Sequence, residues 1–354
     1  MKNKIFIISF LSIIYIFMII TLITPKKEVS KIERRTLATF PKYQMNTEYI
    51  NKLERYLLDH FPFRETFIKI KTHFNFNILQ KEESNDTYII NDYIFKSDYP
   101  TNNKSITNYI DYINNIIKDL TSNNNIYLLV VPDKNYFLND KYLNIDYNYI
   151  YNRLYKELDI NKIDIRNKLT LDNYYKTDNH WKQETLNEIV KEISNSLNLG
   201  YQEENYTKKT YNEFYGVNYG NTFFNQKPEV ITYLYDDYIT NAHVNYLENP
   251  HLHKVYNESK LSIMDSYDVY LDGASSYIEI YNNLSTNNKE LIVFRDSFAS
   301  SIIPLLIKYY SKITVIDNRY ISSNSYKEII TYDNQDILFL NSTLLVNSSN
   351  TLRN

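Results

Sequence analysis

The chain of 354 residues contains no cysteine and only four glycines. Without cysteine the protein forms no disulfide and uses no thiolate, which is compatible with an extracellular protein that does not depend on cross-links. Four glycines leave no glycine-rich phosphate loop, so we expect no nucleotide and no other cofactor. A large charge of one sign is also missing: the formal net charge is -3 with no long basic block. This composition argues against nucleic acid as a partner.

One long apolar run is present, over residues 5–24, and Lys2 and Lys4 precede it. Its length suits a hydrocarbon core of about 30 Å. The residues that follow, Ile-Thr-Pro-Lys-Lys at 23–27, offer no small-residue cleavage site. The sequence therefore favours an uncleaved, single-pass membrane anchor within residues 1–28, and secretion after signal cleavage is the alternative.

The remaining residues, 29–354, are expected to form one α/β domain in which strands alternate with helices. Apolar runs predict strands at 126–131, 160–165, 291–294, 313–316 and 336–340. Helical spacing predicts helices at 105–120, 147–158, 184–197, 298–310 and 324–330. This order is typical of a parallel sheet flanked by helices on both faces, with the site at the carboxyl ends of the strands.

Two further parts of the chain lie outside this alternation of strands and helices. Before it, amphipathic helices are predicted at 46–60 and 63–79, followed by a hairpin at 87–96. Within it, residues 200–289 mix polar loops with an apparent strand and are interpreted as an insertion that shapes the substrate cleft.

The strongest chemical signal is the pair Asp178 and His180. In an extended backbone, residues two positions apart point to the same side, so the carboxylate reaches the imidazole. Ser297 follows the strand at 291–294, at a turn that leads into a helix and leaves backbone N–H groups available. Histidine, with an unperturbed pKa of about 6.5, suits the activation of a serine hydroxyl. The hypothesis is a triad in which Ser297 is the nucleophile, His180 the base and Asp178 its orienting group.

These residues also carry a resemblance. Residues 178–181, Asp-Asn-His-Trp, resemble the signature of the DHHW family, which is similar to the alginate O-acetyltransferases of the SGNH hydrolase-like superfamily. Further stretches follow in the order that this family shows, at 33–37, 61–64, 131–134 and 295–298. One departure is plain, because Asn179 stands where the family has its first histidine.

The resemblance implies an SGNH hydrolase-like (flavodoxin-like) fold and an extracytoplasmic O-acetyltransferase or acetylesterase of the bacterial cell envelope. Its acceptor would be the hydroxyls of a polysaccharide, and its acetyl donor partner would be a multi-spanning membrane acyltransferase. The alternative is a non-catalytic cell-envelope protein that kept the fold. Expected substrate contacts are Arg295, Trp181, Lys134 and Tyr175. Three of them have an alternative role: Arg295 as the ion-pair partner of Asp296, Trp181 in core packing, and Lys134 in a solvated loop.

Structural interpretations compete for the same residues. An Asp-x-His pair also occurs as a plain hydrogen bond, and Asp-Ser at a strand-to-helix turn is a common N-cap. Metal binding is the main chemical rival, with His251 and His253, or Asp178 and His180, as two ligands and His243 as a third.

Overall fold

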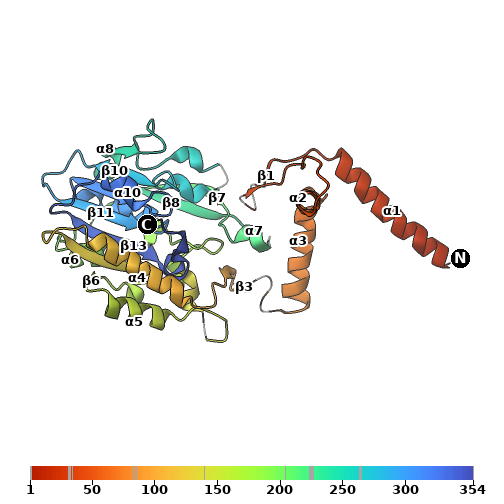
Figure 1. Ribbon diagram of the computed structural model, residues 1–354, viewed down its shortest axis with the longest axis horizontal. Helices are drawn as coiled ribbons and strands as arrows, with labels where there is room; N and C mark the ends of the chain where they lie inside the picture. The colour runs from red at the N-terminus through yellow and green to blue at the C-terminus, as the bar shows by residue number, and fades with distance from the viewer. Residues whose placement is uncertain are drawn as a thin grey trace.

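A computed structural model describes residues 2–30, 33, 35–81, 83, 86–138, 140–203, 205–222, 227–262 and 265–353 (Figure 1). Arg34, which belongs to the motif at 33–37, lies outside the described residues.

A seven-stranded sheet forms the centre of the molecule. Its strands in spatial order are β6 (Asn161–Lys162), β5 (Asn125–Val131), β13 (Asp336–Ser342), β11 (Glu290–Arg295), β12 (Lys312–Ile316), β10 (Tyr277–Tyr281) and β9 (His243–Tyr246). The first five are parallel, whereas β10 and β9 each run antiparallel to their neighbour. The α/β class with a mainly parallel sheet is therefore confirmed. The region 200–289 contributes β9 and β10 to this sheet, so it is more than an insertion over the cleft.

Both faces of the sheet are apolar because successive side chains of each strand point in opposite directions. In β5, Leu129 and Val131 belong to one core cluster and Leu128 and Val130 to the other. The first face is covered by α6 (Asn187–Ser196) and α9 (Ala299–Leu306), and the second by α4 (Asn103–Ile117) and α5 (Tyr147–Glu157). The resulting three layers bring the ends of β5, β11 and β13 together at one edge.

Besides the short antiparallel pair β1 (Val29–Ser30) and β2 (Arg35–Thr36), two longer antiparallel pairs lie outside this sheet in the described part of the chain. The predicted hairpin is present as β3 (Thr87–Ile90) and β4 (Tyr93–Lys96). Asn91 and Asp92 in its turn have φ angles of 48° and 67°, which these residue types tolerate in place of glycine. The second pair is β7 (Thr207–Phe214) and β8 (Glu229–Tyr235), and the short α7 (Tyr219–Thr222) lies between them in sequence. The strand predicted at 160–165 is shorter than expected, because only its residues in β6 pair with the neighbouring strand β5.

The N-terminal part extends from the α/β body, as Figure 1 shows. It consists of α1 (Lys2–Ile23), α2 (Thr47–Asp59) and α3 (Arg64–His73), and a π-helical turn at Phe74–Ile78 continues α3. Helix α3 stands between the body and α1. Among the described residues one helical segment, Lys4–Ile23, is long and apolar enough to cross a bilayer, with a mean hydropathy of 2.8. It fits a membrane anchor or a signal sequence.

Ion pairs hold the motifs at 33–37 and 61–64 together. Glu33 pairs with Arg64 and Arg35, and Arg35 also pairs with Asp59 at the end of α2. Asp59 further accepts the backbone N–H of Ala38 at 2.8 Å. Neighbouring Arg35 lowers the pKa of the Asp59 carboxyl to about 2, so the carboxylate is charged at any physiological pH. The linker after α1 is thus fastened to the corner between α2 and α3.

Candidate active site

A short loop carries Asp178 and His180. Tyr174 and Trp181 form an antiparallel bridge, and the backbone N–H of Tyr175 donates to the carbonyl of His180 at 3.1 Å. The residues between them therefore turn back on themselves, and the extended backbone expected from the sequence is wrong. The two side chains meet for another reason: Oδ1 of Asp178 accepts the backbone N–H of His180 at 3.0 Å, which is a local turn contact that aspartate favours.

Ser297 lies where β11 ends and α9 begins, as the sequence predicts. Asp296 shapes this turn. Its Oδ1 accepts the backbone N–H of Phe298 at 3.0 Å, and its Oδ2 accepts both the backbone N–H and the hydroxyl of Ser342, at 2.7 and 2.6 Å. Asp296 is not the N-cap of α9, because Phe298 occupies that position without a side-chain cap, but Asp296 fixes the turn before the helix and joins the ends of β11 and β13. These contacts leave the adjacent Ser297 side chain available for another partner.

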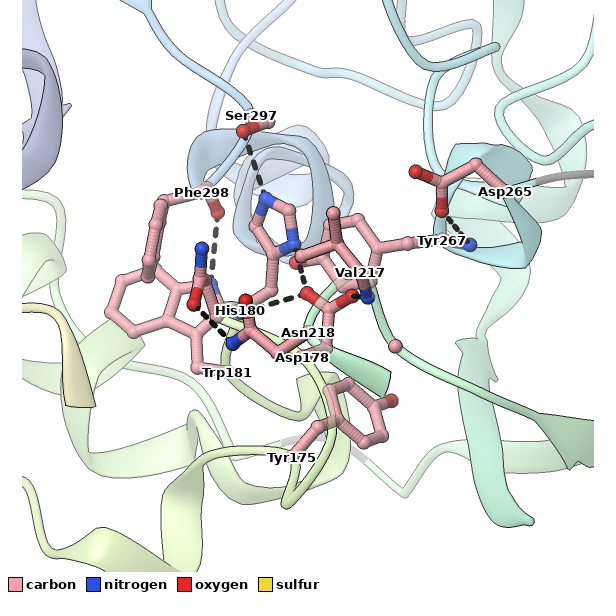
Figure 2. Close-up of polar contacts among 12 residues, drawn as sticks. Tyr175, Asp178, His180, Trp181, Val217, Asn218, Asp265, Tyr267, Ser297 and Phe298 are labelled. Atoms are coloured by element: carbon pink, nitrogen blue, oxygen red, sulfur yellow. Dashed lines mark hydrogen bonds and ion pairs between the residues drawn. The ribbon is translucent and has the colours of Figure 1, made fainter. Parts of the chain in front are cut away.

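The side chains of Asp178, His180 and Ser297 form one hydrogen-bonded chain (Figure 2). Nδ1 of His180 lies 2.6 Å from Oδ1 of Asp178, and Nε2 of His180 lies 2.8 Å from Oγ of Ser297. Asp178 is 1% exposed, whereas the side chain of His180 is 15% exposed and Ser297 is half-buried. The Ser297 end of this chain therefore reaches solvent while the Asp178 end does not.

The second oxygen of Asp178 is held by a distant segment. The backbone N–H of Val217 donates to Oδ2 of Asp178 at 2.8 Å, and the N–H of Gly216 donates to the hydroxyl of Thr177 at 2.8 Å. Such close backbone approach requires glycine at 216, because a Cβ there would lie 2.2 Å from the carbonyl carbon of Thr177. Asn218 completes the contact, donating its side-chain amide to Oδ1 of Asn179 at 2.7 Å.

Aromatic rings enclose the imidazole of His180. The ring of Tyr267 stacks on it with a centroid distance of 4.0 Å and an interplanar angle of 10°, and Phe298 lies 4.9 Å away at a tilted angle. The hydroxyl of Tyr267 donates to Oγ of Ser301 at 2.9 Å. Burial raises the pKa of the Tyr267 hydroxyl well above its usual value, so this ring stays neutral. Together these contacts restrict the imidazole to one orientation.

Lys134 supports the loop from behind. It is 1% exposed, and its ammonium group donates to the carbonyl oxygens of Tyr175, Lys176 and Asp178 at 3.3, 3.1 and 2.6 Å. Burial lowers the pKa of Lys134 to about 8, although nearby carboxylates, first that of Asp178, oppose this effect. Lys134 therefore holds the backbone of the loop instead of facing a substrate.

The other three expected substrate contacts are also inside the protein. The indole N–H of Trp181 donates to the carbonyl of Phe298 at 2.8 Å, which ties the His180 loop to the Ser297 turn. Arg295 has no exposed side-chain surface and donates to the carbonyls of Gly273 and Ser275 at 2.9 and 3.0 Å. Tyr175 is fully buried. In this structure these side chains support the site from within, because each is enclosed by the protein.

The backbone N–H of Ser297 is the candidate donor for a developing oxyanion. The backbone N–H of Ser297 finds no acceptor within the described part of the chain. It lies at the start of the turn into α9, where backbone N–H groups are unpaired in general. It is one of the backbone N–H groups that the sequence leads us to expect at this turn, and the hydrogen bonds of the described residues identify no second donor.

The histidines that were considered as metal ligands lie elsewhere. His243 and His253 stack on each other with a centroid distance of 4.8 Å, and His253 contacts the carbonyl of Val244 at 3.1 Å. Within the described ranges no group of three or more histidine and acidic side chains is placed to hold a metal ion.

Sequence reasoning missed Val217, Asn218 and Tyr267. All three lie in the region 200–289, where the sequence shows neither strong periodicity nor a motif. The scarcity of glycine was a usable signal, since Gly216 precedes two of them in a chain with four glycines.

Comparison with known proteins identifies similar structures. The sequence matches no protein-family model and no curated protein. A DHHW family protein from Eubacterium siraeum is 20% identical, with a TM-score of 0.63 over 77% of this chain and 97% of that chain. PatB1 of Bacillus cereus, solved with a sulfonyl adduct, is 20% identical, with a TM-score of 0.59 over 76% and 96% of the two chains. The O-acetyltransferase domain of Pseudomonas putida AlgJ is 10% identical, with a TM-score of 0.43 over 74% and 92%. The chain therefore has the α/β fold of a DHHW family protein.

Proposed function

We propose that this protein is an extracytoplasmic enzyme that moves acetyl groups onto or off polysaccharide hydroxyls through an acyl-serine intermediate. The observation that carries the proposal is the hydrogen-bonded chain from Asp178 through His180 to Ser297. A serine hydroxyl is a weak nucleophile until a neighbouring base takes its proton, and the 2.8 Å contact with Nε2 supplies such a base.

The reaction follows from these contacts. Oγ of Ser297 attacks the carbonyl carbon of the acetyl donor while Nε2 of His180 takes the hydroxyl proton, and Asp178 stabilises the imidazolium that forms. The backbone N–H of Ser297 faces the negative charge that develops on the carbonyl oxygen. The bond from the acetyl carbon to the leaving oxygen then breaks, and His180 returns the proton to that oxygen.

The second half repeats these steps in reverse. An acceptor hydroxyl gives its proton to Nε2 of His180 and attacks the acetyl carbon, and Ser297 recovers its proton as it leaves. When the acceptor is a sugar hydroxyl the result is transfer, and when it is water the result is hydrolysis. The two outcomes differ in whether water is kept away from the acyl-serine.

One comparison supports an acyl-serine route. PatB1, which has the same fold, was solved with a sulfonyl adduct, and sulfonyl groups bond to activated nucleophiles in general. The sequence resemblance to the DHHW family, similar to alginate O-acetyltransferases, supports a polysaccharide acceptor. It also supports a multi-spanning membrane acyltransferase as donor partner, because a single helix such as α1 cannot carry activated acetyl groups across a bilayer. We place the protein at the cell membrane with α1 as an uncleaved anchor and the α/β domain outside.

The test uses the full chain in detergent with 4-nitrophenyl acetate as donor. Wild type is compared with Ser297→Ala, His180→Ala and, as a control, Ser325→Ala, which changes an exposed serine. We expect wild type and the control to release nitrophenol, and the other two variants to fall to the background rate. Intact-mass analysis should find an acetyl adduct on wild type, and a sulfonyl fluoride should modify wild type but not Ser297→Ala.

A wild-type rate equal to that of both variants, with no adduct, would count against Ser297 as the nucleophile. The non-catalytic envelope protein would then be the better description. Addition of oligosaccharide acceptors to an active enzyme separates transferase from esterase, since a transferase yields acetylated sugar.

A further inference from the structure

Helix α3 turns its polar side toward the α/β body. Thr72 and Asn75 are buried there, and the hydroxyl of Thr72 donates to the carbonyl of Thr222 in α7 at 2.5 Å. In the usual surface helix the apolar side faces the protein and the polar side faces water. Helix α3 departs from this arrangement: its one buried residue, Thr72, is polar, and Phe67 and Ile70 are exposed while Ile68 is half-buried.

Ile68 and Phe76 are half-buried, whereas five other apolar residues of α3, its N-cap and its π-helical turn are exposed. They recur at intervals of three or four residues, so they share one face of the helix. Each is between 44% and 62% exposed: Phe63, Phe67, Ile70, Phe74 and Ile78, here called the α3 stripe. An exposed apolar face of this size on a water-soluble surface marks an interaction site.

The α3 stripe is continuous with α1. The ring of Phe17 in α1 stacks on Phe61 with a centroid distance of 5.5 Å and contacts Phe67 at 5.9 Å. Phe17 precedes Ile23, the last residue of the apolar segment, by six residues. At 1.5 Å per residue this is about 9 Å inside the end of that segment, a depth within one leaflet of a bilayer. The stripe therefore begins at the level where α1 would meet lipid.

Helix α2 also exposes apolar side chains. None of its residues, all of which are described, is buried. Ile50, Leu57 and Leu58 are among its exposed apolar side chains. The two helices flank the end of α1 that leads into the body, so both present apolar side chains around the same end of the anchor.

The charges of α3 match a lipid surface. Within this helix Lys69 and Lys71 outnumber the single acidic residue, Glu65, while Arg64 is already paired with Glu33. Lys26 and Lys27 follow α1 directly. A helix with an apolar stripe and an excess of basic residues is typical of one that lies in the membrane interface, with lysine side chains extending to the headgroups.

We propose that the α3 stripe lies in the outer leaflet of the bilayer that α1 spans, and that α3 thereby holds the catalytic body against the membrane surface. The inference rests on the proposed role of α1 as an anchor. In this arrangement the hydrogen bond from Thr72 to α7 joins the body to the membrane-bound helix. It also places the site beside a membrane, where a membrane-embedded acetyl donor would be found.

The absence of cysteine from the chain makes a direct test practical. Single-cysteine variants Ile70→Cys and Phe74→Cys in the stripe, Ile13→Cys in α1 and Lys69→Cys on the exposed basic side are made in the full chain. Each carries a nitroxide spin label in proteoliposomes of phosphatidylcholine and phosphatidylglycerol. Collisions with oxygen report lipid, and collisions with a water-soluble nickel chelate report water.

We expect the labels at 13, 70 and 74 to collide mainly with oxygen, and the label at 69 mainly with the nickel chelate. Labels at 70 and 74 that behave like the label at 69, while the label at 13 reports lipid, would overturn the proposal and leave the anchor intact. Labels at 70 and 74 shielded from both reagents, or an Ile70→Cys disulfide dimer, would assign the stripe to a protein partner or a second copy and would overturn it as well. A label at 13 that collides mainly with the nickel chelate would contradict both the role of α1 as an anchor and the proposal for α3. Aryl acetate turnover, measured on the same samples, tests the catalytic function independently.

Discussion

Val217 donates its backbone N–H to Oδ2 of Asp178 at 2.8 Å, although 39 residues separate them in the sequence. The carboxylate that orients His180 is thus held at both oxygens, by the imidazole at one and by this N–H at the other. The contact depends on Gly216, whose backbone approaches Thr177 more closely than any side chain allows.

Gly216→Ala should therefore damage the site. The added Cβ would lie 2.2 Å from backbone atoms of Thr177 and 2.3 Å from the N of Asp178, so the two segments must separate. Because a displacement of about 1 Å in a catalytic group can cost about 100-fold in rate, we expect a fall of that order in kcat/KM for aryl acetate. Gly200→Ala is the matched control: Gly200 has φ of 70° and open space around it, so stability should fall by about 1 to 2 kcal/mol with unchanged kinetics. Full activity in Gly216→Ala would show that Asp178 does not need Val217.

Tyr267 offers a test of the stacked ring. Tyr267→Phe keeps the ring over His180 and loses the hydrogen bond to Ser301, so stability should fall by about 1 kcal/mol while kcat changes little. Tyr267→Leu removes the aromatic face that stabilises the imidazolium, an effect of about 1 to 2 kcal/mol that should lower kcat about 10-fold with little change in KM. Equal kcat values for the two variants would reduce the ring to a packing role.

The residues of the hydrogen-bonded chain could be located in the sequence because each has a local signal. Asp178 and His180 are two positions apart, and Ser297 follows an apolar strand that ends at the correct edge of a parallel sheet. The same alternation of strands and helices predicted the central sheet.

The supports of the site could not be found in this way. Val217 contributes a backbone N–H, which has no sequence signature, and Tyr267 is one of 37 tyrosines. Lys134 was expected near a substrate because it follows the end of a strand, and Arg295 because a guanidinium can bind a carboxylate. Charged residues are also rarely buried. Both are buried because the carbonyl oxygens of neighbouring loops accept their hydrogen bonds, an arrangement that only the tertiary structure creates.

Lys134 should produce a measurable pH dependence of stability. Its pKa is about 8 in the folded protein, whereas an unfolded chain has about 10.4 for lysine. Between these values the unfolded state binds more protons, so the free energy of unfolding contributed by this site rises from pH 8 to pH 10 and is constant below pH 8. Urea unfolding at several pH values should show this rise as the difference between wild type and Lys134→Met, because buried tyrosines with raised pKa values contribute a fall near pH 10 that both proteins share.

Lys176→Met is the control for that measurement, since Lys176 lies on the same loop but is 42% exposed at its side chain. It should keep the wild-type dependence on pH. Lys134→Met should also lower kcat, because the carbonyls of Tyr175, Lys176 and Asp178 lose their shared donor. A pH profile identical to that of wild type would mean that Lys134 titrates outside this range.

Asn179 is the position at which the chain departs from the DHHW signature, and its contact shows what the side chain must supply. Its Oδ1 accepts the amide of Asn218 at 2.7 Å, so the group needed here is a hydrogen-bond acceptor. A neutral histidine has an acceptor nitrogen, and Asn179→His should therefore keep the rate within a few-fold of wild type. Asn179→Ala leaves the Asn218 amide without this partner, which costs about 1 to 3 kcal/mol for a buried donor and loosens the segment that carries Val217. Thermal unfolding and aryl acetate kinetics of the two variants check both expectations. If Asn179→Ala matches wild type in stability and rate, the bond to Asn218 has no part in holding the Asp178 carboxylate.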